Sequence, residues 1–248
     1  MTSSWGWQFE GSSTTLRTIV VDVAGTVHED GERMNQLSRT LLFLPGISGH
    51  GDFWRPVAEQ LQSFGRCVLL DWPGFGGNPA APTVNGYEDL VDLVLAHAAC
   101  PTVLIAQSMG GYVALRAALA AGRAGPGQVD VTHLVLAATS GGVDVSRFGA
   151  LDWRPETLQA QPGLPAWATE AVPDLAEQLA QVRIPCLLVW ASDDPISPLA
   201  VGEHLQSLLP DARLVVYEGD DHWVARIEAV AVAREIIRLL DSSGEEHS

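Results

Sequence analysis

The chain has 248 residues, 47% of them hydrophobic, and its 30 acidic residues against 14 basic ones give a formal net charge of −16. All of the basic residues are arginines, because the sequence contains no lysine. This excess of negative charge repels phosphate backbones and anionic lipid, so we expect neither a nucleic-acid-binding protein nor a membrane-surface protein. The missing lysine excludes Schiff-base catalysis, covalent pyridoxal phosphate and the lysine-dependent phosphate loop.

Cysteine usage and the N-terminus point to a reducing compartment. Cys67, Cys100 and Cys186 are far apart and form no Cys-x-x-Cys pair, which predicts buried core thiols. The first nine residues have no basic region followed by an apolar one, and no apolar run approaches the ~18 residues that span a bilayer. We therefore expect a cytoplasmic protein that acts on a small molecule without metal or cofactor. Its oligomeric state is left open.

Short apolar runs predict the strands, which in chain order are 18–24, 40–44, 67–71, 102–107, 132–138, 185–191 and 213–217. A polar stretch containing Gly31 separates the first two, and an antiparallel arrangement is left open for them. The other five are almost continuously apolar, which is typical of strands buried on both faces of a parallel sheet.

Segments with apolar residues three and four apart alternate with these strands and predict helices at 53–63, 87–98, 109–121, 175–182, 199–209 and 223–240. Gly122 is expected to end the third helix and Asp174 to begin the fourth. The alternation predicts an α/β fold, a mostly parallel, doubly wound sheet of about eight strands with helices on both faces. We expect residues 1–248 to form a single domain.

Residues from about 140 to 173 interrupt this alternation. They have no clear strand but contain prolines, glycines and the aromatics Phe148, Trp153 and Trp167. We interpret them as a short cap inserted after a strand. Together with Trp223, these three aromatics are the candidate lining of a substrate pocket, and packing of the cap on the body explains any one of them equally well.

The strongest local signal is the sequence VLIAQSMGGY at residues 103–112. An apolar strand runs into Ser108, Ala106 and Gly110 flank that serine at two residues on either side, and a helical pattern follows at once. This is the pattern of a nucleophile elbow with alanine in place of the usual first glycine. The elbow would project the Ser108 hydroxyl from the carboxyl end of the sheet, and the Met109 amide at the helix start would stabilise a developing oxyanion.

A serine hydroxyl needs a base, and the base needs an orienting carboxylate. Asp193 and Asp194 come just after the strand at 185–191, and His222 lies in the loop after the last strand. Because the carboxyl ends of parallel strands share one edge of a sheet, these side chains should meet Ser108 there. A glycine-rich loop follows the strand at 40–44, and its Ile47 amide is the candidate second oxyanion donor.

Over nearly its whole length the chain resembles the α/β-hydrolase superfamily, with five motifs in the family's order. They are PGISG with Phe53-Trp54, DWPGFGG at residues 71–77, QSMGG at the elbow, Ala191-x-x-Asp194-Pro195 and Gly219-x-x-His222. Pro45 replaces the customary histidine of the first motif and Ala106 the first glycine of the elbow. Family spacing favours Asp194 as the acid, and Asp193 is the next candidate. Asp144 is the third candidate, because some relatives place the acid after the preceding strand.

The resemblance implies acyl transfer by Ser108, His222 and Asp194, with the amides of Ile47 and Met109 as the oxyanion hole. The first hypothesis is hydrolysis of a small carboxylic ester or lactone. The second is another reaction on the same triad, either hydrolysis of a carbon–carbon bond or a pyruvate-eliminating synthesis. The third is a binding protein with a non-working site. Arg147 and Arg154 in the cap are candidate partners for a substrate carboxylate, and solvated surface arginines are the alternative.

Overall fold

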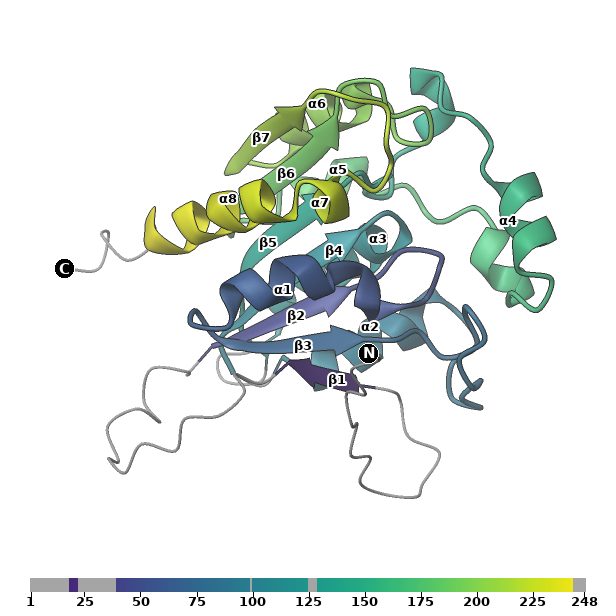
Figure 1. Ribbon diagram of the computed structural model, residues 1–248, viewed down its shortest axis with the longest axis horizontal. Coiled ribbons are helices and arrows are strands. Elements are labelled where there is room, and N and C mark those ends of the chain that lie inside the picture. Colours follow the sequence, from purple (N-terminus) through teal and green to yellow (C-terminus); the bar gives the residue numbers. More distant parts are fainter. Residues whose placement is uncertain (1–17, 22–38, 99, 125–128, 243–248) are drawn as a thin grey trace, which may run out of the picture.

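A sheet of seven strands forms the centre of the computed structural model, which describes residues 18–21, 39–98, 100–124 and 129–242 (Figure 1). The strand order is β1-β3-β2-β4-β5-β6-β7. The strands are β1 (Thr18–Val21), β2 (Thr40–Leu44), β3 (Arg66–Leu70), β4 (Thr102–Gln107), β5 (Val131–Ala137), β6 (Cys186–Ala191) and β7 (Ala212–Tyr217).

Six of these strands are parallel, and only the edge strand β1 is antiparallel to its neighbour β3. β1 and β2 are therefore not paired with each other, and β2 runs parallel to β3 and β4. The count of about eight strands is not confirmed, since the described residues contain seven. The predicted strand at 18–24 ends at Val21 in the described part, and its last three residues lie outside it.

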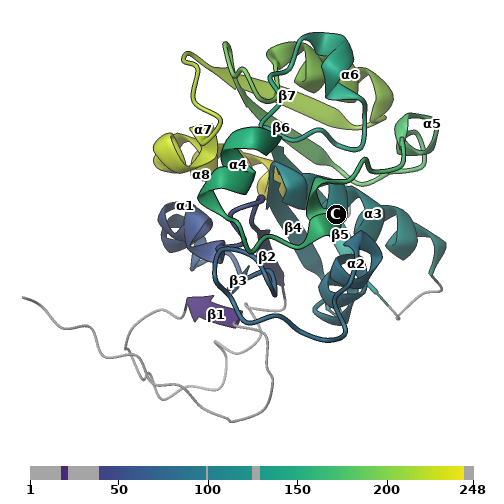
Figure 2. The same ribbon diagram turned by 90° about the vertical axis from the view of Figure 1, so that its right-hand side faces the viewer.

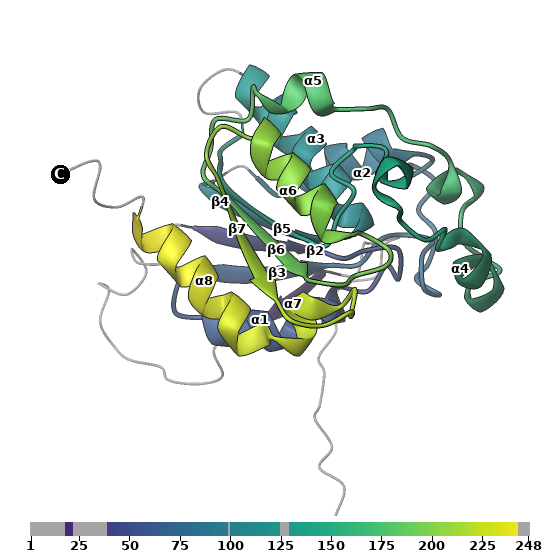
Figure 3. The same ribbon diagram turned by 90° about the horizontal axis from the view of Figure 1, so that it is seen from above.

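Helices cover both faces of the sheet, as the view from above shows (Figure 3). One face carries η2 (Gly51–Trp54), α1 (Arg55–Leu61), α7 (Val224–Ile227) and α8 (Ala229–Ser242). The other carries α2 (Tyr87–Ala96), α3 (Met109–Arg123), α5 (Ala176–Leu179) and α6 (Leu199–Leu208).

Alternate residues of each strand face the two helical layers, which explains why the strands are apolar throughout. In β4, Val103 and Ile105 belong to the core beneath α1 and α8, whereas Leu104 and Ala106 belong to the core beneath α2 and α3. Every residue of β4 is buried. A strand with only one apolar face would leave one of these layers without a partner.

The chain crosses from one side of the sheet to the other between β2 and β4, because β3 lies beyond β2 and β5 lies beyond β4. Loops after neighbouring strands diverge at such a switch point and leave a crevice at the carboxyl edge. Residues 140–173 lie over this edge and contain η3 (Val145–Phe148), α4 (Arg154–Ala160) and η4 (Ala166–Thr169) (Figure 2).

Several helix boundaries differ from the sequence predictions. The last helix is interrupted at Glu228, which separates α7 from α8. Gly122 does not end α3, because the helix continues one residue further to Arg123. Asp174 Oδ1 accepts the amide of Ala176, the first residue of α5, at 2.8 Å, but Leu175 is the N-cap and α5 is shorter than predicted.

Two of the three thiols lie in the core. Cys67 and Cys186 are buried, and burial raises the pKa of each thiol to about 12, so both stay protonated. Cys100 is exposed, contrary to the prediction, because it lies in the connection before β4.

Within the described residues, no helix is long and apolar enough to cross a membrane.

A buried histidine in β5 should make the stability of the fold depend on pH. His133 is 6% exposed, and burial together with the positive charge of Arg39 lowers its pKa from 6.5 to about 4. The unfolded chain takes up this proton first, so the associated stability is complete above pH 6.5 and is lost as the pH falls toward 4.

The free energy of unfolding of the wild-type protein should fall between about pH 7.5 and pH 5. In His133→Gln we expect this fall to be smaller by about 2 kcal/mol. Urea denaturation of both proteins at the two pH values measures this difference. An unchanged loss in the variant would contradict the assignment of a neutral buried imidazole.

Candidate active site

The turn between β4 and α3 holds Ser108 in a strained conformation, with φ 51° and ψ −121°. Such positive φ values cost a non-glycine residue on the order of 1–3 kcal/mol and persist only where the surroundings enforce them. Here the Ser108 amide donates to Ala137 O at 3.0 Å, and Thr139 Oγ1 donates to Ser108 O at 2.6 Å. Ala106 is fully buried in β4, so the elbow forms with alanine at that position.

The glycine after the elbow allows α3 to approach the loop that follows β2. A Cβ on Gly110 would lie 2.4 Å from Pro45 O, which is closer than any real contact. That loop is held by two buried tryptophans, because Trp54 Nε1 donates to Leu44 O at 2.9 Å and Trp72 Nε1 to Pro45 O at 2.8 Å. The proline that replaces the family's histidine therefore keeps its carbonyl in a fixed position.

Ser108, His222 and Asp194 form a continuous line of hydrogen bonds. His222 Nε2 lies 3.0 Å from Ser108 Oγ, and its Nδ1 lies 2.7 Å from Asp194 Oδ2. With the ring proton on Nδ1, the imidazole donates to the carboxylate and accepts from the serine hydroxyl. The Asp194 side chain is fully buried and that of His222 is 13% exposed, so both lie in a setting that water screens weakly.

Asp194, rather than its neighbour, is the acid that reaches the histidine. Its Oδ1 accepts the amides of Ile196 at 2.8 Å and Ser197 at 3.1 Å, which fixes the carboxylate in the loop after β6. Asp193 is exposed and binds the Ser192 hydroxyl instead. Asp144 is exposed too, and it caps η3 through the Ser146 amide.

Two buried hydroxyls that the sequence reasoning did not single out connect the elbow to the acid loop. Thr139 is fully buried and Ser197 is 2% exposed. Ser197 Oγ donates to Thr139 O at 3.0 Å, while Thr139 Oγ1 donates to Ser108 O. Together with the Ser197–Asp194 bond, these contacts close a ring that runs through Ser108, His222 and Asp194. The available sequence signal was that Thr139 and Ser197 both lie in the connections that follow strand ends, those of β5 and β6.

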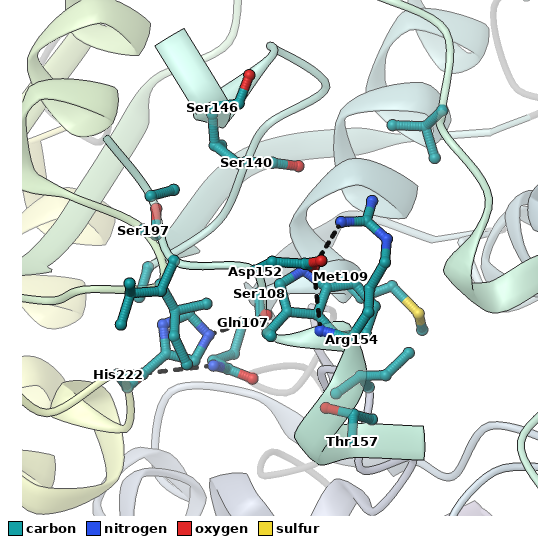
Figure 4. Close-up of a pocket in the computed structure, with 18 of the residues that line it drawn as sticks. Gln107, Ser108, Met109, Ser140, Ser146, Asp152, Arg154, Thr157, Ser197 and His222 are labelled. Carbon is teal, nitrogen blue, oxygen red and sulfur yellow. Dashed lines mark hydrogen bonds and ion pairs between the residues drawn. The ribbon is translucent and has the colours of Figure 1, made fainter. Parts of the chain in front are cut away.

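Gln107 is a third residue that the sequence did not indicate. It precedes Ser108, is 4% exposed, and its Nε2 donates to His222 O at 3.4 Å (Figure 4). A Cβ on Gly46 would lie 2.3 Å from Gln107 Oε1, so the glutamine also packs against the loop after β2. It thereby contacts both the histidine loop and the loop that carries Ile47.

Ser108 and His222 open into a cavity of about 750 Å³ at the carboxyl edge of the sheet. Ile47 and Met109, the two expected oxyanion donors, line the same cavity. Met109 is the first residue of α3, where an amide has no acceptor within its own helix. The roof consists of residues from the 140–173 segment, α4 among them (Figure 4).

Of the four predicted aromatic residues, Trp153 and Trp223 line this cavity, and Phe148 and Trp167 do not. Trp167 packs edge-on against Phe75 and Tyr87, with ring centroids 5.4 and 5.2 Å apart. Phe148 packs beside the His204 ring, with centroids 5.3 Å apart. Phe148 and Trp167 therefore attach the 140–173 segment to the body, instead of lining the pocket.

Three further hydrogen bonds attach that segment to the body. Tyr87 Oη donates to Ala168 O at 2.9 Å, the Gly76 amide to Gln161 Oε1 at 3.2 Å, and the Leu151 amide to Pro195 O at 2.7 Å.

Within the described residues, no group of three or more histidine, cysteine, aspartate or glutamate side chains is arranged to hold a metal ion.

Curated relatives match part of the chain. A 2-succinyl-6-hydroxy-2,4-cyclohexadiene-1-carboxylate synthase of Salmonella typhimurium is 39% identical over 83 residues, which are 32% of this chain and 32% of that protein. The chain thus matches about a third of the length of these relatives. The same activity is named for matching proteins of other Salmonella strains at the same identity and coverage.

Solved structures are similar over nearly the whole chain. MenH from S. aureus has a TM-score of 0.68 at 16% identity and covers 91% of this chain and 98% of its own. A lipase-esterase related protein from Clostridium acetobutylicum has a TM-score of 0.66 at 19% identity, with coverages of 90% and 99%. The meta-cleavage product hydrolase CumD from Pseudomonas fluorescens IP01 has a TM-score of 0.67 at 18% identity, with coverages of 93% and 96%. At these identities the likeness concerns the fold.

The profile of the alpha/beta hydrolase family matches residues 41–235, well over half of the sequence. The parallel sheet with helices on both faces agrees with that family, which confirms the fold class expected from the motifs. The chain belongs to the α/β hydrolase family.

Proposed function

We propose that this α/β hydrolase cleaves carboxylic esters or lactones of small molecules through a covalent acyl-enzyme on Ser108. The observation that carries the proposal is the line of hydrogen bonds from Ser108 Oγ through the His222 ring to the buried Asp194 carboxylate, at 3.0 and 2.7 Å. Nucleophile, base and orienting acid are the three roles that acyl transfer by serine requires. They stand beside a cavity large enough for a small ester.

In the first half of the reaction Ser108 Oγ attacks the ester carbonyl carbon while its proton passes to His222 Nε2. The charge that develops on the imidazolium is stabilised by Asp194, which also holds the ring in the tautomer with the proton on Nδ1. The tetrahedral intermediate then expels the alcohol, which receives the proton from Nε2 and leaves the acyl group on Ser108. Water repeats the sequence, with His222 as its base, and releases the acid.

The negative oxygen of each tetrahedral intermediate needs preorganised donors. The amides of Ile47 and Met109 are our candidates, because both residues line the cavity beside Ser108. Their carrier elements are rigid: one lies on the loop that Trp54 and Trp72 hold, and the other begins α3. Donors fixed in this way need no reorganisation as charge develops, which is the main source of their effect on rate.

The 140–173 segment acts as a cap in this proposal. It covers the cavity from the side opposite the elbow and is joined to the body by the three hydrogen bonds of Tyr87, Gly76 and Leu151. In this position the segment shapes the space that a substrate occupies next to Ser108.

A second candidate function is suggested by the curated relatives, which are named as synthases of a succinyl cyclohexadiene carboxylate. The same serine and histidine could take part in such an elimination, or in hydrolysis of a carbon–carbon bond as the name of CumD indicates for that protein. A panel of nitrophenyl esters, run beside a dienone substrate and the substrate of the synthase, distinguishes these reactions. Turnover of the esters alone supports the first proposal, and turnover of the others alone supports the second.

Replacement of the nucleophile gives the most direct kinetic test. Ser108→Ala removes the hydroxyl that forms the acyl-enzyme in this proposal, so we expect kcat for nitrophenyl butyrate to fall by about 10⁴-fold or more. Circular dichroism and urea denaturation serve as the control that the variant folds. A folded variant that retains a tenth of the wild-type ester turnover would contradict the role of Ser108.

Two neighbouring aspartates provide a matched pair for the acid. Asp194→Asn should lower kcat by about 10³-fold or more, because the amide no longer stabilises the imidazolium or fixes its tautomer. Asp193→Asn makes the same change of charge one residue away, on an exposed side chain bound to Ser192, and should change kcat by no more than about twofold. Equal losses in the two variants would contradict the assignment of Asp194.

A further inference from the structure

The charged side chains that line the cavity are strongly unbalanced. Five of them are carboxylates and one is a guanidinium: Asp144, Asp152, Glu156, Glu170, Asp174 and Arg154. All six belong to the segment between β5 and β6 that covers the cavity. A substrate bound in this cavity therefore lies near an acidic surface.

Arg154 is already engaged by its own neighbours. Its Nη1 lies 3.0 Å from Asp152 Oδ1 (Figure 4). Its Nε donates to Thr169 O at 3.0 Å, and its guanidinium carbon lies 5.1 Å from the centre of the Trp153 ring. Arg147, the other arginine considered as a partner for a substrate carboxylate, does not line the cavity. Two of the three guanidinium nitrogens are thus already hydrogen-bonded, and a substrate carboxylate that bound the third would lie beside Asp152 and four further carboxylates that repel it.

The carboxylates that remain after this pairing are Asp144, Glu156, Glu170 and Asp174. Asp144 accepts the Ser146 hydroxyl at 2.6 Å and the Ser146 amide at 3.0 Å, and these hydrogen bonds lower the pKa of its carboxyl group. It therefore stays ionised at neutral pH. Because these four carboxylates are solvent-exposed, they act on a charged substrate through a long-range electrostatic field. Salt screens this field.

An exposed aromatic surface lies in the same cavity. Trp223 directly follows His222, is 55% exposed, and packs edge-on against Phe53 with ring centroids 6.3 Å apart. Phe53 lines the cavity as well. Aromatic rings accompanied by carboxylates are the usual partners of a quaternary ammonium group, which is attracted by the ring face and by the negative charge.

From this combination, and resting on the proposed function, we propose that the cavity selects esters whose alcohol carries a quaternary ammonium group and discriminates against esters that carry a carboxylate. The curated relatives are named for a product that is itself a carboxylate. The acidic lining of this cavity, with its single arginine already paired, is unsuited to such a molecule. The two groups of proteins would then share the chemistry at the elbow and differ in the charge of the substrate.

The experiment compares three esters of butyrate that differ only in the alcohol. The first alcohol is choline, which is cationic, the second is dimethylbutanol, its uncharged carbon isostere, and the third is hydroxybutanoate, which is anionic. We expect kcat/KM at low ionic strength to fall in this order, with about tenfold or more between the first and the last. Salt should lower the value for the choline ester by about threefold or more and raise that for the anionic ester, while the uncharged ester changes little.

Two glutamates test whether the cavity itself causes this preference. The Glu156 and Glu170 side chains take no part in the hydrogen bonds that hold Arg154, so Glu156→Gln with Glu170→Gln should leave the fold intact. The double variant should lower the ratio of kcat/KM for choline ester to uncharged ester by about threefold or more. The control is Glu59→Gln with Glu203→Gln, an equal change of net charge on exposed positions of α1 and α6. This control should keep the wild-type ratio.

The outcomes separate the inference from the proposed function. If all three esters are cleaved in a Ser108-dependent manner with equal kcat/KM, or if the anionic ester is preferred, the charge selection is wrong and the hydrolase assignment stands. If none of the three is cleaved and no other ester is, the proposed function fails. If the control pair lowers the ratio as much as the cavity pair, the net charge of the protein causes the preference and the role of the cavity is overturned.

Discussion

The histidine ring between Ser108 and Asp194 is the element on which the whole site depends. Its two nitrogen atoms engage side chains from two different strand ends, while the ring itself comes from the loop after a third, so three loops must stay in register to within a fraction of an ångström. The ring of hydrogen bonds through Thr139 and Ser197 holds these loops in place, because it joins the loops after β4, β5 and β6 by buried contacts. Removal of one buried partner would leave the other without a hydrogen bond, which is costly away from water.

The sheet makes this convergence possible. The six parallel strands end at one edge, and the switch point between β2 and β4 places the Ile47 loop and the Ser108 elbow on adjacent strands. The strain at Ser108 is therefore supported by a core buried on both faces of β4. Strands and helices fix the reacting groups, and the segment between β5 and β6 shapes the cavity.

Much of this arrangement follows from the sequence. Continuous apolar runs predicted the strands from β2 to β7, because burial on both faces leaves no polar alternation, and the order of Ser108, Asp194 and His222 predicted which side chains would meet. Long-range packing could not be predicted. Nothing local in Thr139 or Ser197 shows that their hydroxyls face one another across two loops, and Trp167 and Phe148 have the composition of pocket residues but pack against the body. The break at Glu228 and the exposure of Cys100 likewise depend on neighbours distant in sequence.

Family membership and substrate are separate questions in this chain. The motifs and the sheet assign the fold and indicate the chemistry, whereas the molecule attacked depends on the side chains above the elbow. Those side chains are acidic and aromatic here, with Arg154 held by Asp152.

The central claim is that Ser108 is the nucleophile of a working triad, and covalent labelling tests it most directly. Wild-type protein treated with a fluorophosphonate should gain the mass of one phosphonyl group, and peptide mapping should locate it on Ser108. Addition should be slowed strongly in Asp194→Asn, because the histidine then no longer activates the hydroxyl. A wild-type protein that stays unlabelled, or that carries the adduct on another residue, would contradict the account.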